Sequence, residues 1–442
     1  MRRRLVIVMF VVLASRTTAW AQALQSDRHE PLASRFVDRV NGLTVEQAIE
    51  RALGQEPGLR AARAEVDVAR GMSAQAALKP NPSVTFTQLT EPAGTDAQTR
   101  IDVEWPLDLF RKTGRVNVAE RELEATKETA ADRERLLISD VRMKVGEVLA
   151  AVRELSITDE LVALTSRQHA LMAARADEGA IPPLERDMVR VELQRLQADR
   201  MLQAGHAEHA LFELKRLLGL RANSPLTLRE DLEQLVARET ATDVPIAPDT
   251  GETTRADVAE AEARVNAADA RIDQARREGR FDVSLFGMYM RADSGFAQRG
   301  FGPENDLERV RGVFHNLGGG VMVSVPLRDR KQGDIAAARA QRVGAQAQLE
   351  AKRLSVETEI AAARARDDHA RRALALYTAD TRDLARRNLD VVSQTYDVGR
   401  MTLFDVLNER RRYLDTERAY TNALREAYDA RLALRTALGE VR

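Results

Sequence analysis

Gly399–Asp405, GRMTLFD, corresponds position by position to Gly179–Glu185, GAIPPLE, 220 residues earlier, and this correspondence decides the fold. A second match keeps the same offset, because Leu217–Gly219 corresponds to Ala437–Gly439. Similarity at a fixed offset indicates that one structural unit is used more than once. The chain is therefore predicted to contain a twofold internal repeat.

Each copy of the repeat contains a long helical hairpin. The runs 114–177 and 333–397 carry a helix pattern that only isolated glycines interrupt, and a helix of the first length spans roughly 96 Å. Glycine at 179 and 399 permits the positive φ that a helix end or a tight turn needs. The predicted hairpins are 114–219 and 333–439, and small and leucine-like residues alternate along them with Arg and Glu, as in coiled coils.

Two short strands precede each hairpin, because the apolar period changes there from 3.6 to 2. The first copy predicts strands at about 82–90 and 98–106, and the second at about 281–291 and 314–326, with a long loop at about 293–312. The residues expected on apolar faces are Val84, Phe86, Ile101, Val103, Trp105, Phe281, Val283, Leu285, Tyr289, Val321, Val323 and Val325. Alternation of this kind is typical of membrane barrel strands.

The chain begins with the pattern of a secretory signal peptide, assigned to residues 1–21. Arg2–Arg4 are followed by a short apolar run, and cleavage is expected between Ala21 and Ala23. The first repeat then covers 22–219, a looser connecting segment 220–252, and the second repeat 253–442. Within the first repeat, the capping-box pattern Thr44–Gln47 opens a helix that breaks at Pro57.

Composition excludes several classes of protein. Charged residues make up 31% of 442 residues and aromatic residues 4%, which suits long solvated helices rather than a bundle of membrane helices. The net charge of −1 gives no basic footprint for nucleic acid. The absence of cysteine excludes disulfides, thiolate metal sites and a lipid-modified amino-terminal cysteine.

The sequence contains no recognisable catalytic constellation and no cofactor motif, so an enzyme is not expected. His206 and His209 lie three residues apart on a predicted helix, with Glu213 one turn further. Such a face can hold a metal ion, but polar residues on a solvated helix are the favoured interpretation, and no metal site is assigned.

Four strands cannot close a barrel, and an open sheet edge is not tolerated in lipid. Transmembrane barrels begin at eight strands. The missing strands are therefore expected from symmetry-related copies, and three copies would supply 12. The predicted fold class is mainly α with a small β part.

The chain resembles the TolC-like outer-membrane efflux protein family, from about Leu43 to Gly439. The resemblance rests on Leu43–Ala48, LTVEQA, on Pro80–Pro82, PNP, and above all on Tyr396–Leu407, YDVGRMTLFDVL. It implies a homotrimer in which a 12-stranded outer-membrane β-barrel continues into a long periplasmic α-helical barrel. Its implied partners are outer-membrane lipid, a periplasmic adaptor (membrane fusion) protein and an inner-membrane pump of the resistance-nodulation-division type.

The resemblance also implies roles for particular residues. The hairpin tips, where the adaptor would bind, are Gly179, Ala180, Ile181, Gly399, Arg400 and Met401. The constricted periplasmic entrance would involve Tyr396, Asp405 and its repeat equivalent Glu185. Asp405 is also the third residue of the helix that Thr402 would cap, so capping and gating both remain open. Asn408 stands where the family often has an acid, which argues against a strongly acidic entrance ring. Asp102 and Glu104 would line the barrel lumen.

The predicted function is a passive channel in a tripartite efflux system of a Gram-negative bacterium. The proline-flanked entry to the first strand, Pro80–Pro82, and the Arg/Ala-rich hairpins most resemble the heavy-metal branch of that family, of cobalt–zinc–cadmium type. Multidrug efflux and type I secretion are the alternatives. A rival of another class is a periplasmic coiled-coil scaffold without a pore.

Overall fold

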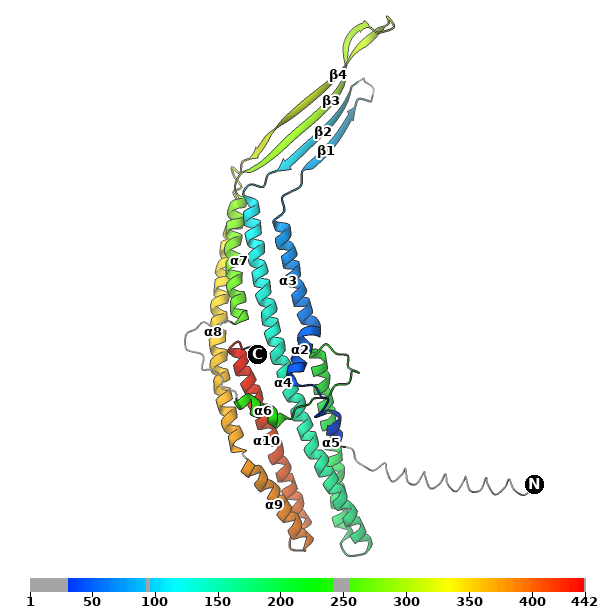
Figure 1. The fold of residues 1–442 in the computed structure, drawn as a ribbon, viewed down its shortest axis with the longest axis vertical. Coiled ribbons are helices and arrows are strands. Elements are labelled where there is room, and N and C mark those ends of the chain that lie inside the picture. Colours follow the sequence, from blue (N-terminus) through cyan, green and yellow to red (C-terminus); the bar gives the residue numbers. More distant parts are fainter. Residues whose placement is uncertain (1–30, 93–95, 242–254, 378, 441–442) are drawn as a thin grey trace, which may run out of the picture. The chain divides into compact units, whose positions relative to one another are not determined.

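A computed structural model describes residues 31–92, 96–241, 255–377 and 379–440. These residues form two compact units, and Figure 1 labels their helices and strands. The helical unit comprises 31–57, 135–241 and 359–440, and the strand unit comprises 58–134 and 255–358. The predicted signal peptide lies outside the described residues. The division into repeats 22–219 and 253–442 remains a prediction, since the compact units combine segments of both repeats.

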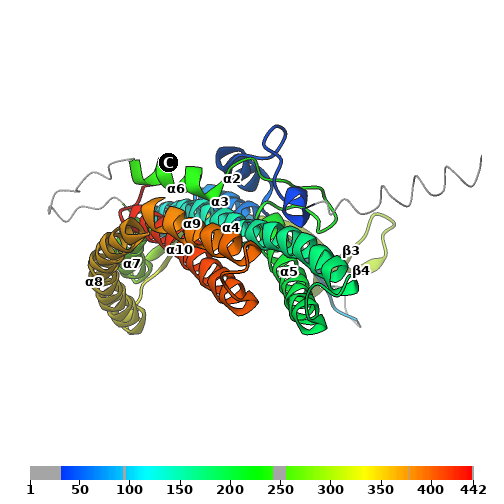
Figure 2. The same cartoon turned by 90° about the horizontal axis from the view of Figure 1, so that it is seen from below.

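The helical unit contains two hairpins, α4–α5 and α9–α10, whose turns lie at the same end of the unit (Figure 2). Its elements are the 3-10 helix Leu32–Arg35, α2 (Val45–Gln55), the later part of α4 (Arg111–Asp177), α5 (Pro183–Leu217), α6 (Leu232–Ala241), the last part of α8 (Gln332–Leu376), α9 (Ala379–Asp397) and α10 (Leu403–Ala437). The strand unit contains α3 (Pro57–Ala76), α7 (Ala256–Glu278) and the remaining parts of α4 and α8. No described helix has a stretch long and apolar enough to cross a membrane.

The helix boundaries follow from local sequence. The Thr44 hydroxyl accepts from the Gln47 N–H, and the Gln47 side chain accepts from the Thr44 N–H, so the predicted capping box opens α2. The helix ends at Gln55, with Glu56 as its extended C-cap, and Pro57 begins α3, where the missing N–H of proline costs nothing.

The hairpin ends confirm the twofold repeat. Helices α5 and α10 each have 35 residues, at an offset of 220. Gly179 and Gly399 have φ of 74° and 75°. The residue after each glycine donates its N–H to a carbonyl five residues earlier. Ala180 donates to Arg175, and Arg400 donates to Thr395. This is the glycine-dependent helix end that the two matching stretches require.

The second long helical run is not continuous, which corrects the prediction for residues 333–397. Helix α8 ends at Leu376 and α9 begins at Ala379. The Tyr377 N–H donates to the Leu374 carbonyl at 3.0 Å, an i to i−3 bond that tightens the last turn and ends the α-helical ladder there.

The strands form one antiparallel sheet in the order β1-β2-β3-β4, as expected for four strands per chain. Strand β1 covers Ser83–Thr90, β2 Ala97–Pro106, β3 Asp282–Phe301 and β4 Leu307–Ser324. The prediction of a long loop at 293–312 was wrong, because β3 and β4 continue as a hairpin closed by residues 302–306. Gly295, Gly300 and Gly312 lie within the ladder, whereas Gly302 lies in the closing turn, and a bulge between Gly295 and Arg299 absorbs the irregular spacing.

The register aligns the predicted apolar positions across the whole sheet. Phe86 lies opposite Ile101, Ile101 opposite Tyr289, and Tyr289 opposite Leu317. Four residues further along the strands, Trp105 lies opposite Leu285 and Leu285 opposite Val321. Directly opposite residues share a face, so these side chains form one apolar surface, and they remain exposed in the single chain. Phe281 lies just before β3 and packs edge-on against Phe110.

Candidate functional site

The turns of the two hairpins form an exposed end of the helical unit. Gly179, Ala180, Gly399, Arg400 and Met401 are exposed, and Ile181 is half-buried. Large apolar side chains near these turns are exposed to solvent: Leu184, Val398 and Phe404 are each more than 60% exposed. Exposed apolar residues gathered at one end are typical of a surface that binds another protein.

Behind these turns the two hairpins pack on each other. Met172 of α4, Val189 of α5 and Leu403 of α10 form a buried cluster. Ile181, Met188, Tyr396 and Leu407 pack against it. Residues far apart in the chain therefore fix the two turns side by side within the unit.

Tyr396 and Glu185, two of the predicted entrance residues, contact each other directly. The Tyr396 hydroxyl donates to the Glu185 carboxylate at 3.0 Å and also lies 3.6 Å from the Met172 sulfur. Burial, followed by the hydrogen bond to Glu185, raises the pKa of Tyr396 to about 12. The phenol therefore remains a neutral donor that joins α9 to α5.

Asp405, the third predicted entrance residue, contacts a different group. Its carboxylate accepts from the Thr402 N–H at 3.0 Å and from the Thr402 hydroxyl at 2.7 Å. The Thr402 hydroxyl in turn accepts from the Asp405 N–H, which completes a capping box. The Thr402 hydroxyl and N–H, in that order, lower the pKa of Asp405. Asp405 therefore caps α10, and its proposed gating role is additional to that contact.

The predicted lumen residues lie on the sheet face opposite the apolar one. Arg100, Asp102 and Glu104 alternate with Ile101 and Val103 along β2, and Arg100 pairs with Asp102 at 2.8 Å. Arg100 therefore lies as a counter-charge beside Asp102 on this face.

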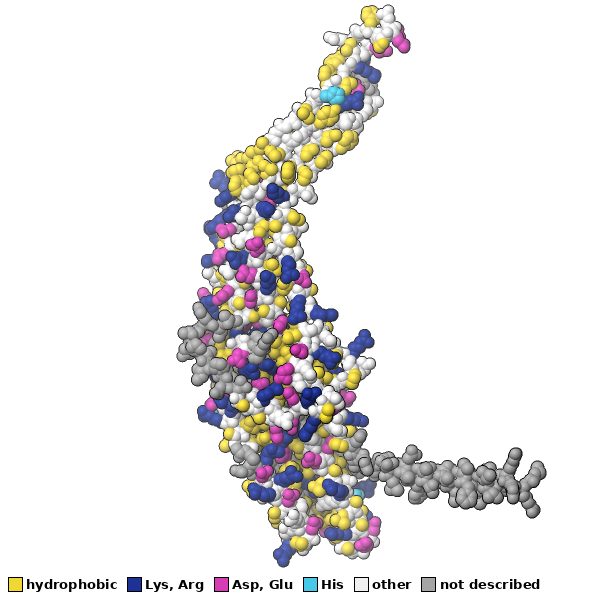
Figure 3. All heavy atoms as spheres, in the orientation of Figure 1, with side chains coloured by type: hydrophobic (Ala, Val, Ile, Leu, Met, Phe, Trp, Pro, Cys, Tyr) yellow, Lys and Arg dark blue, Asp and Glu magenta, His cyan; other side chains and the backbone are white. Residues whose placement is uncertain are grey.

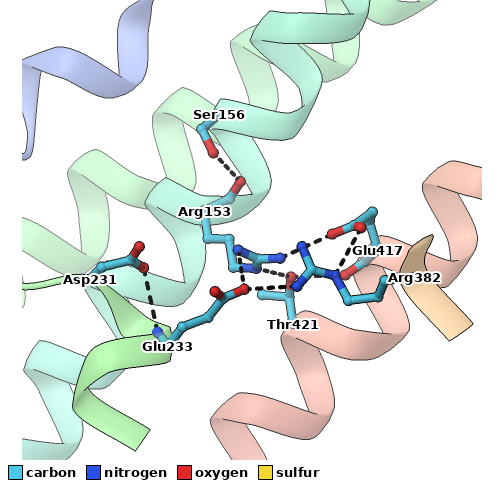
Figure 4. Close-up of polar contacts among 7 residues, drawn as sticks. All are labelled: Arg153, Ser156, Asp231, Glu233, Arg382, Glu417 and Thr421. Carbon is cyan, nitrogen blue, oxygen red and sulfur yellow. Dashed lines mark hydrogen bonds and ion pairs between the residues drawn. The ribbon is translucent and has the colours of Figure 1, made fainter. Parts of the chain in front are cut away.

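A partly buried ion-pair network that sequence reasoning missed joins four helices of the helical unit (Figure 4). Arg153 of α4 and Arg382 of α9 each pair with both Glu233 of α6 and Glu417 of α10, at 2.9–3.2 Å. The Glu417 side chain is only 5% exposed. Both guanidinium groups also lie over the Tyr420 ring. The network is closed and neutral, and it connects both hairpins to the segment between the repeats.

A second network lies further along α10. Arg431 pairs with Asp367 of α8 at 3.2 Å, and both side chains are buried. Arg435 pairs with Glu239 of α6 at 2.6 Å. The signal in the sequence was the heptad spacing of 403, 406, 410, 414, 417, 421, 424, 428 and 431, which is the buried seam of α10. Its polar members Arg410, Glu417, Thr421 and Arg431 occupy core positions and therefore needed partners.

The described residues contain no group of three or more His, Asp or Glu that could hold a metal ion. His206 and His209 are exposed on α5, and Glu213 is half-buried and pairs with Arg216 at 3.1 Å. The arrangement supplies packing, docking and ion-pair surfaces rather than reacting groups.

The geometry defines a class of protein: a chain that combines a small antiparallel sheet with an exposed apolar face and two long helical hairpins. A model of the outer membrane efflux protein family matches residues 48–220 and 250–440. The chain therefore belongs to the outer membrane efflux protein family. It is an outer-membrane efflux channel component that extends into the periplasm, not an enzyme, and the scaffold without a pore is set aside.

Individual relatives agree with this assignment. The cobalt-zinc-cadmium resistance protein CzcC of Cupriavidus metallidurans is 24% identical over 448 residues, covering 99% of this chain and all of that protein. The crystal structure of CusC, described in terms of transmembrane channel formation, has a TM-score of 0.72 at 20% identity, covering 92% of this chain and 93% of that one. A membrane protein from Pseudomonas aeruginosa has a TM-score of 0.70 at 20% identity, covering 93% of each chain.

Proposed function

We propose that three copies of this chain close a 12-stranded β-barrel in the outer membrane, which continues into a periplasmic α-helical barrel. The observation that carries this proposal is the apolar face that crosses all four strands in register. Strands β1 and β4 are the edges of the sheet, and unpaired edges are not tolerated in lipid. Pairing β4 of one copy with β1 of the next removes every edge.

The duct is proposed to export metal cations from the periplasm, in a system of the cobalt–zinc–cadmium type. The support is the full-length similarity to CzcC, whose name records resistance to these metals. Export of small toxic compounds by a multidrug pump is the second candidate, and type I secretion the third. Energy would come from an inner-membrane pump of the resistance-nodulation-division type.

The exposed hairpin turns are proposed to dock the periplasmic adaptor. Gly179, Ala180, Ile181, Gly399, Arg400 and Met401 lie at one end of the helical unit, with exposed apolar side chains around them. The contacts beneath them, from Tyr396 to Glu185 and from Asp405 to Thr402, are proposed to hold the periplasmic entrance closed. Asp102 and Glu104 are proposed to line the barrel lumen.

The substrate class is tested by deleting the gene and measuring growth against zinc, cobalt, cadmium and copper beside a panel of lipophilic drugs. Sensitivity to metals alone, restored by complementation, is the expected result. Sensitivity to drugs alone would assign the duct to a multidrug pump. Purification of the protein as a periplasmic monomer would contradict the trimeric channel itself.

The entrance is tested by single-channel conductance of two variants that break the same capping box. Asp405→Ala removes the carboxylate, whereas Thr402→Ala removes the capping hydroxyl and keeps the charge. A higher conductance for Asp405→Ala alone assigns gating to the carboxylate. Equal increases in both variants assign the effect to the helix end, and unchanged conductance in a correctly assembled trimer removes the gating role.

A further inference from the structure

The apolar face of the sheet ends at a definite row of residues. The row Phe86, Ile101, Tyr289 and Leu317 is the last one on this face with an apolar residue in all four strands, and the next row is Gln88, Thr99, Arg291 and His315. The Tyr289 hydroxyl and His315 Nδ1 lie 2.7 Å apart across this boundary. From Val283 to Tyr289 the apolar stretch of β3 is six steps long, or roughly 20 Å along the strand. This is close to the apolar band of about 25 Å in membrane barrels.

Strands β3 and β4 continue past this boundary, where β1 and β2 end. The last pair of β1 and β2 is Thr90 with Ala97, and Ala97 lies opposite Asp293. The β3–β4 hairpin extends further, to Phe301 and Leu307 (Figure 1). Figure 3 shows hydrophobic side chains over the part of the strands nearest the helices and basic side chains beyond them.

The extension places arginines on the same face as the apolar band. In β4, residues 309 and 311 have the same parity as Leu317 and Val321, so Arg309 and Arg311 lie on that face. Arg299 lies opposite Arg309, and Arg291 lies in the boundary row. All four arginines are exposed. Asp293 is the acid on this face, while Glu308 lies opposite Gly300 on the other face.

This arrangement is unfavourable for an isolated hairpin. Like charges directly opposite each other destabilise a strand pair, and Arg299 and Arg309 are such a pair. In the described strands, the recorded ion pairs are those of Asp102 with Arg100 and of Asp282 with Arg111. The four arginines therefore face solvent with one aspartate among them, a net excess of positive charge that an external anion would balance.

We infer that the arginine face of the β3–β4 hairpin, formed by Arg291, Arg299, Arg309 and Arg311, binds the phosphate groups of glycolipids in the outer leaflet. The inference rests on the proposed barrel, in which the apolar face is turned to lipid. The arginines then lie immediately beyond the hydrocarbon, at the level of charged headgroups. Arginine suits this role because its planar fork binds phosphate in a bidentate manner. Phe301 and Leu307, opposite each other and exposed at the hairpin end, would contact the sugar portion.

The test measures binding of lipid A, a glycolipid with two phosphomonoesters, to the purified protein in detergent. The test variant is Arg309→Gln with Arg311→Gln. The matched control, Arg339→Gln with Arg364→Gln, removes the same charge from exposed positions of α8. A basic residue near an anionic surface contributes about fivefold in affinity, so the test variant is expected to bind about 25-fold more weakly and the control like the wild type. Arg309→Lys with Arg311→Lys should retain most of the affinity.

Two further ligands identify what is bound. Lipid A stripped of its phosphates should bind as weakly to the wild type as lipid A binds to the test variant, and an excess of inorganic phosphate should not displace lipid A. Equal binding by the test variant, equal binding of the stripped glycolipid, or full displacement by inorganic phosphate would each overturn the inference. If the double variant does not assemble, Arg311→Gln alone, expected about fivefold weaker, decides the matter.

Conductance of the same preparations in lipid bilayers separates this inference from the channel on which it rests. Channels that conduct normally while lipid A binding is independent of the arginines would overturn the inference and leave the channel intact. A wild-type protein that binds lipid A through the arginines but never conducts would contradict the proposed channel instead.

Discussion

Helices α5 and α10 occupy equivalent positions of the repeat, yet the chain uses them differently. Both have 35 residues and both end at a glycine with positive φ, Gly219 at 68° and Gly439 at 82°. In each, the residue after the glycine donates back to a carbonyl five residues earlier. Their lengths and ends are therefore set by the same short local motifs.

The buried faces of the two helices differ. The seam of α10 buries Arg410, Glu417, Thr421 and Arg431, whereas the equivalent residues of α5 are Arg190, Gln197, Met201 and Leu211. Of these four, Leu211 alone is buried. Helix α5 instead exposes Leu184, Val191, Met201 and Leu202. Helix α10 thus packs inside its own chain, and α5 keeps an apolar surface that a second copy would cover in the proposed trimer.

The largest expected effect comes from breaking the α10 seam. Glu417→Ala removes the buried carboxylate of the network and leaves Arg153 and Arg382, both half-buried, with Glu233 as their remaining carboxylate partner. Breaking a fully buried ion pair by removing one partner typically costs about 3–5 kcal/mol, and the partial exposure of Arg382 and Glu233 lowers the expected loss to about 3 kcal/mol or less. A urea titration followed by circular dichroism should show this loss in the free energy of unfolding.

The control for that experiment lies at the equivalent position of α5. Gln197 is exposed, so Gln197→Ala should change stability by no more than about 0.5 kcal/mol. Equal losses in the two variants would mean that the network does not contribute to stability, and that the contrast between the helices is only geometric.

The next effect concerns the α5 surface. Leu202 is 67% exposed in the single chain, and full burial of a leucine stabilises by about 1.5–3 kcal/mol. Leu202→Gln should therefore shift the protein toward monomer in detergent, measured by mass photometry over a dilution series, while Gln197→Ala leaves the trimer unchanged. A monomer fraction identical to that of the wild type would exclude this part of α5 from the interface.

Alanine substitutions at two glycines, Gly146 and Gly205, should change the free energy of unfolding in opposite directions. A Cβ at Gly146 of α4 would lie 2.6 Å from two carbons of the Tyr428 ring, and Tyr428 is fully buried on α10. Gly146→Ala should therefore cost about 1–3 kcal/mol through overpacking. A Cβ at Gly205 of α5 meets no atom within 4 Å, so Gly205→Ala should stabilise by about 0.5–1 kcal/mol. Thermal unfolding of both variants checks the signs, and two shifts in the same direction would contradict this account.

The same contrast explains what could be predicted from the sequence. The capping box at Thr44, the turns at Gly179 and Gly399 and the alternating strands depend on short local patterns, and the structure contains each of them. The length of β3 and β4 depends on pairing between segments that are distant or glycine-rich, and local turn signals at Gly295 and Gly300 gave the wrong answer there. The end of α8 at Leu376 could not be predicted, because no glycine or proline lies near it in the sequence.

The candidate site divides in the same way. The family resemblance predicted Tyr396 as an entrance residue, and the repeat added Glu185. The structure places these two side chains in contact. The resemblance also predicted Asp405 as an entrance residue, and its carboxylate accepts hydrogen bonds from Thr402. The network of Arg153, Glu233, Arg382 and Glu417 was not predicted, because each charge is ordinary on a long solvated helix until tertiary packing brings four helices together.

The last effect concerns a contact that exists in the second repeat only, because the residue equivalent to Tyr396 in the first repeat is Ala176. Tyr396→Phe removes one hydrogen bond to Glu185 and should cost about 1 kcal/mol. The pKa of Tyr396 is raised to about 12, whereas that of an unfolded tyrosine is about 10. The stabilisation from this contact should therefore be constant below pH about 10 and decline as the pH rises toward 12. The measurement is the difference in unfolding free energy between wild type and variant at each pH, with Tyr377→Phe as the control. A difference that already changes between pH 6 and 8 would show that a group other than the phenol governs this contact.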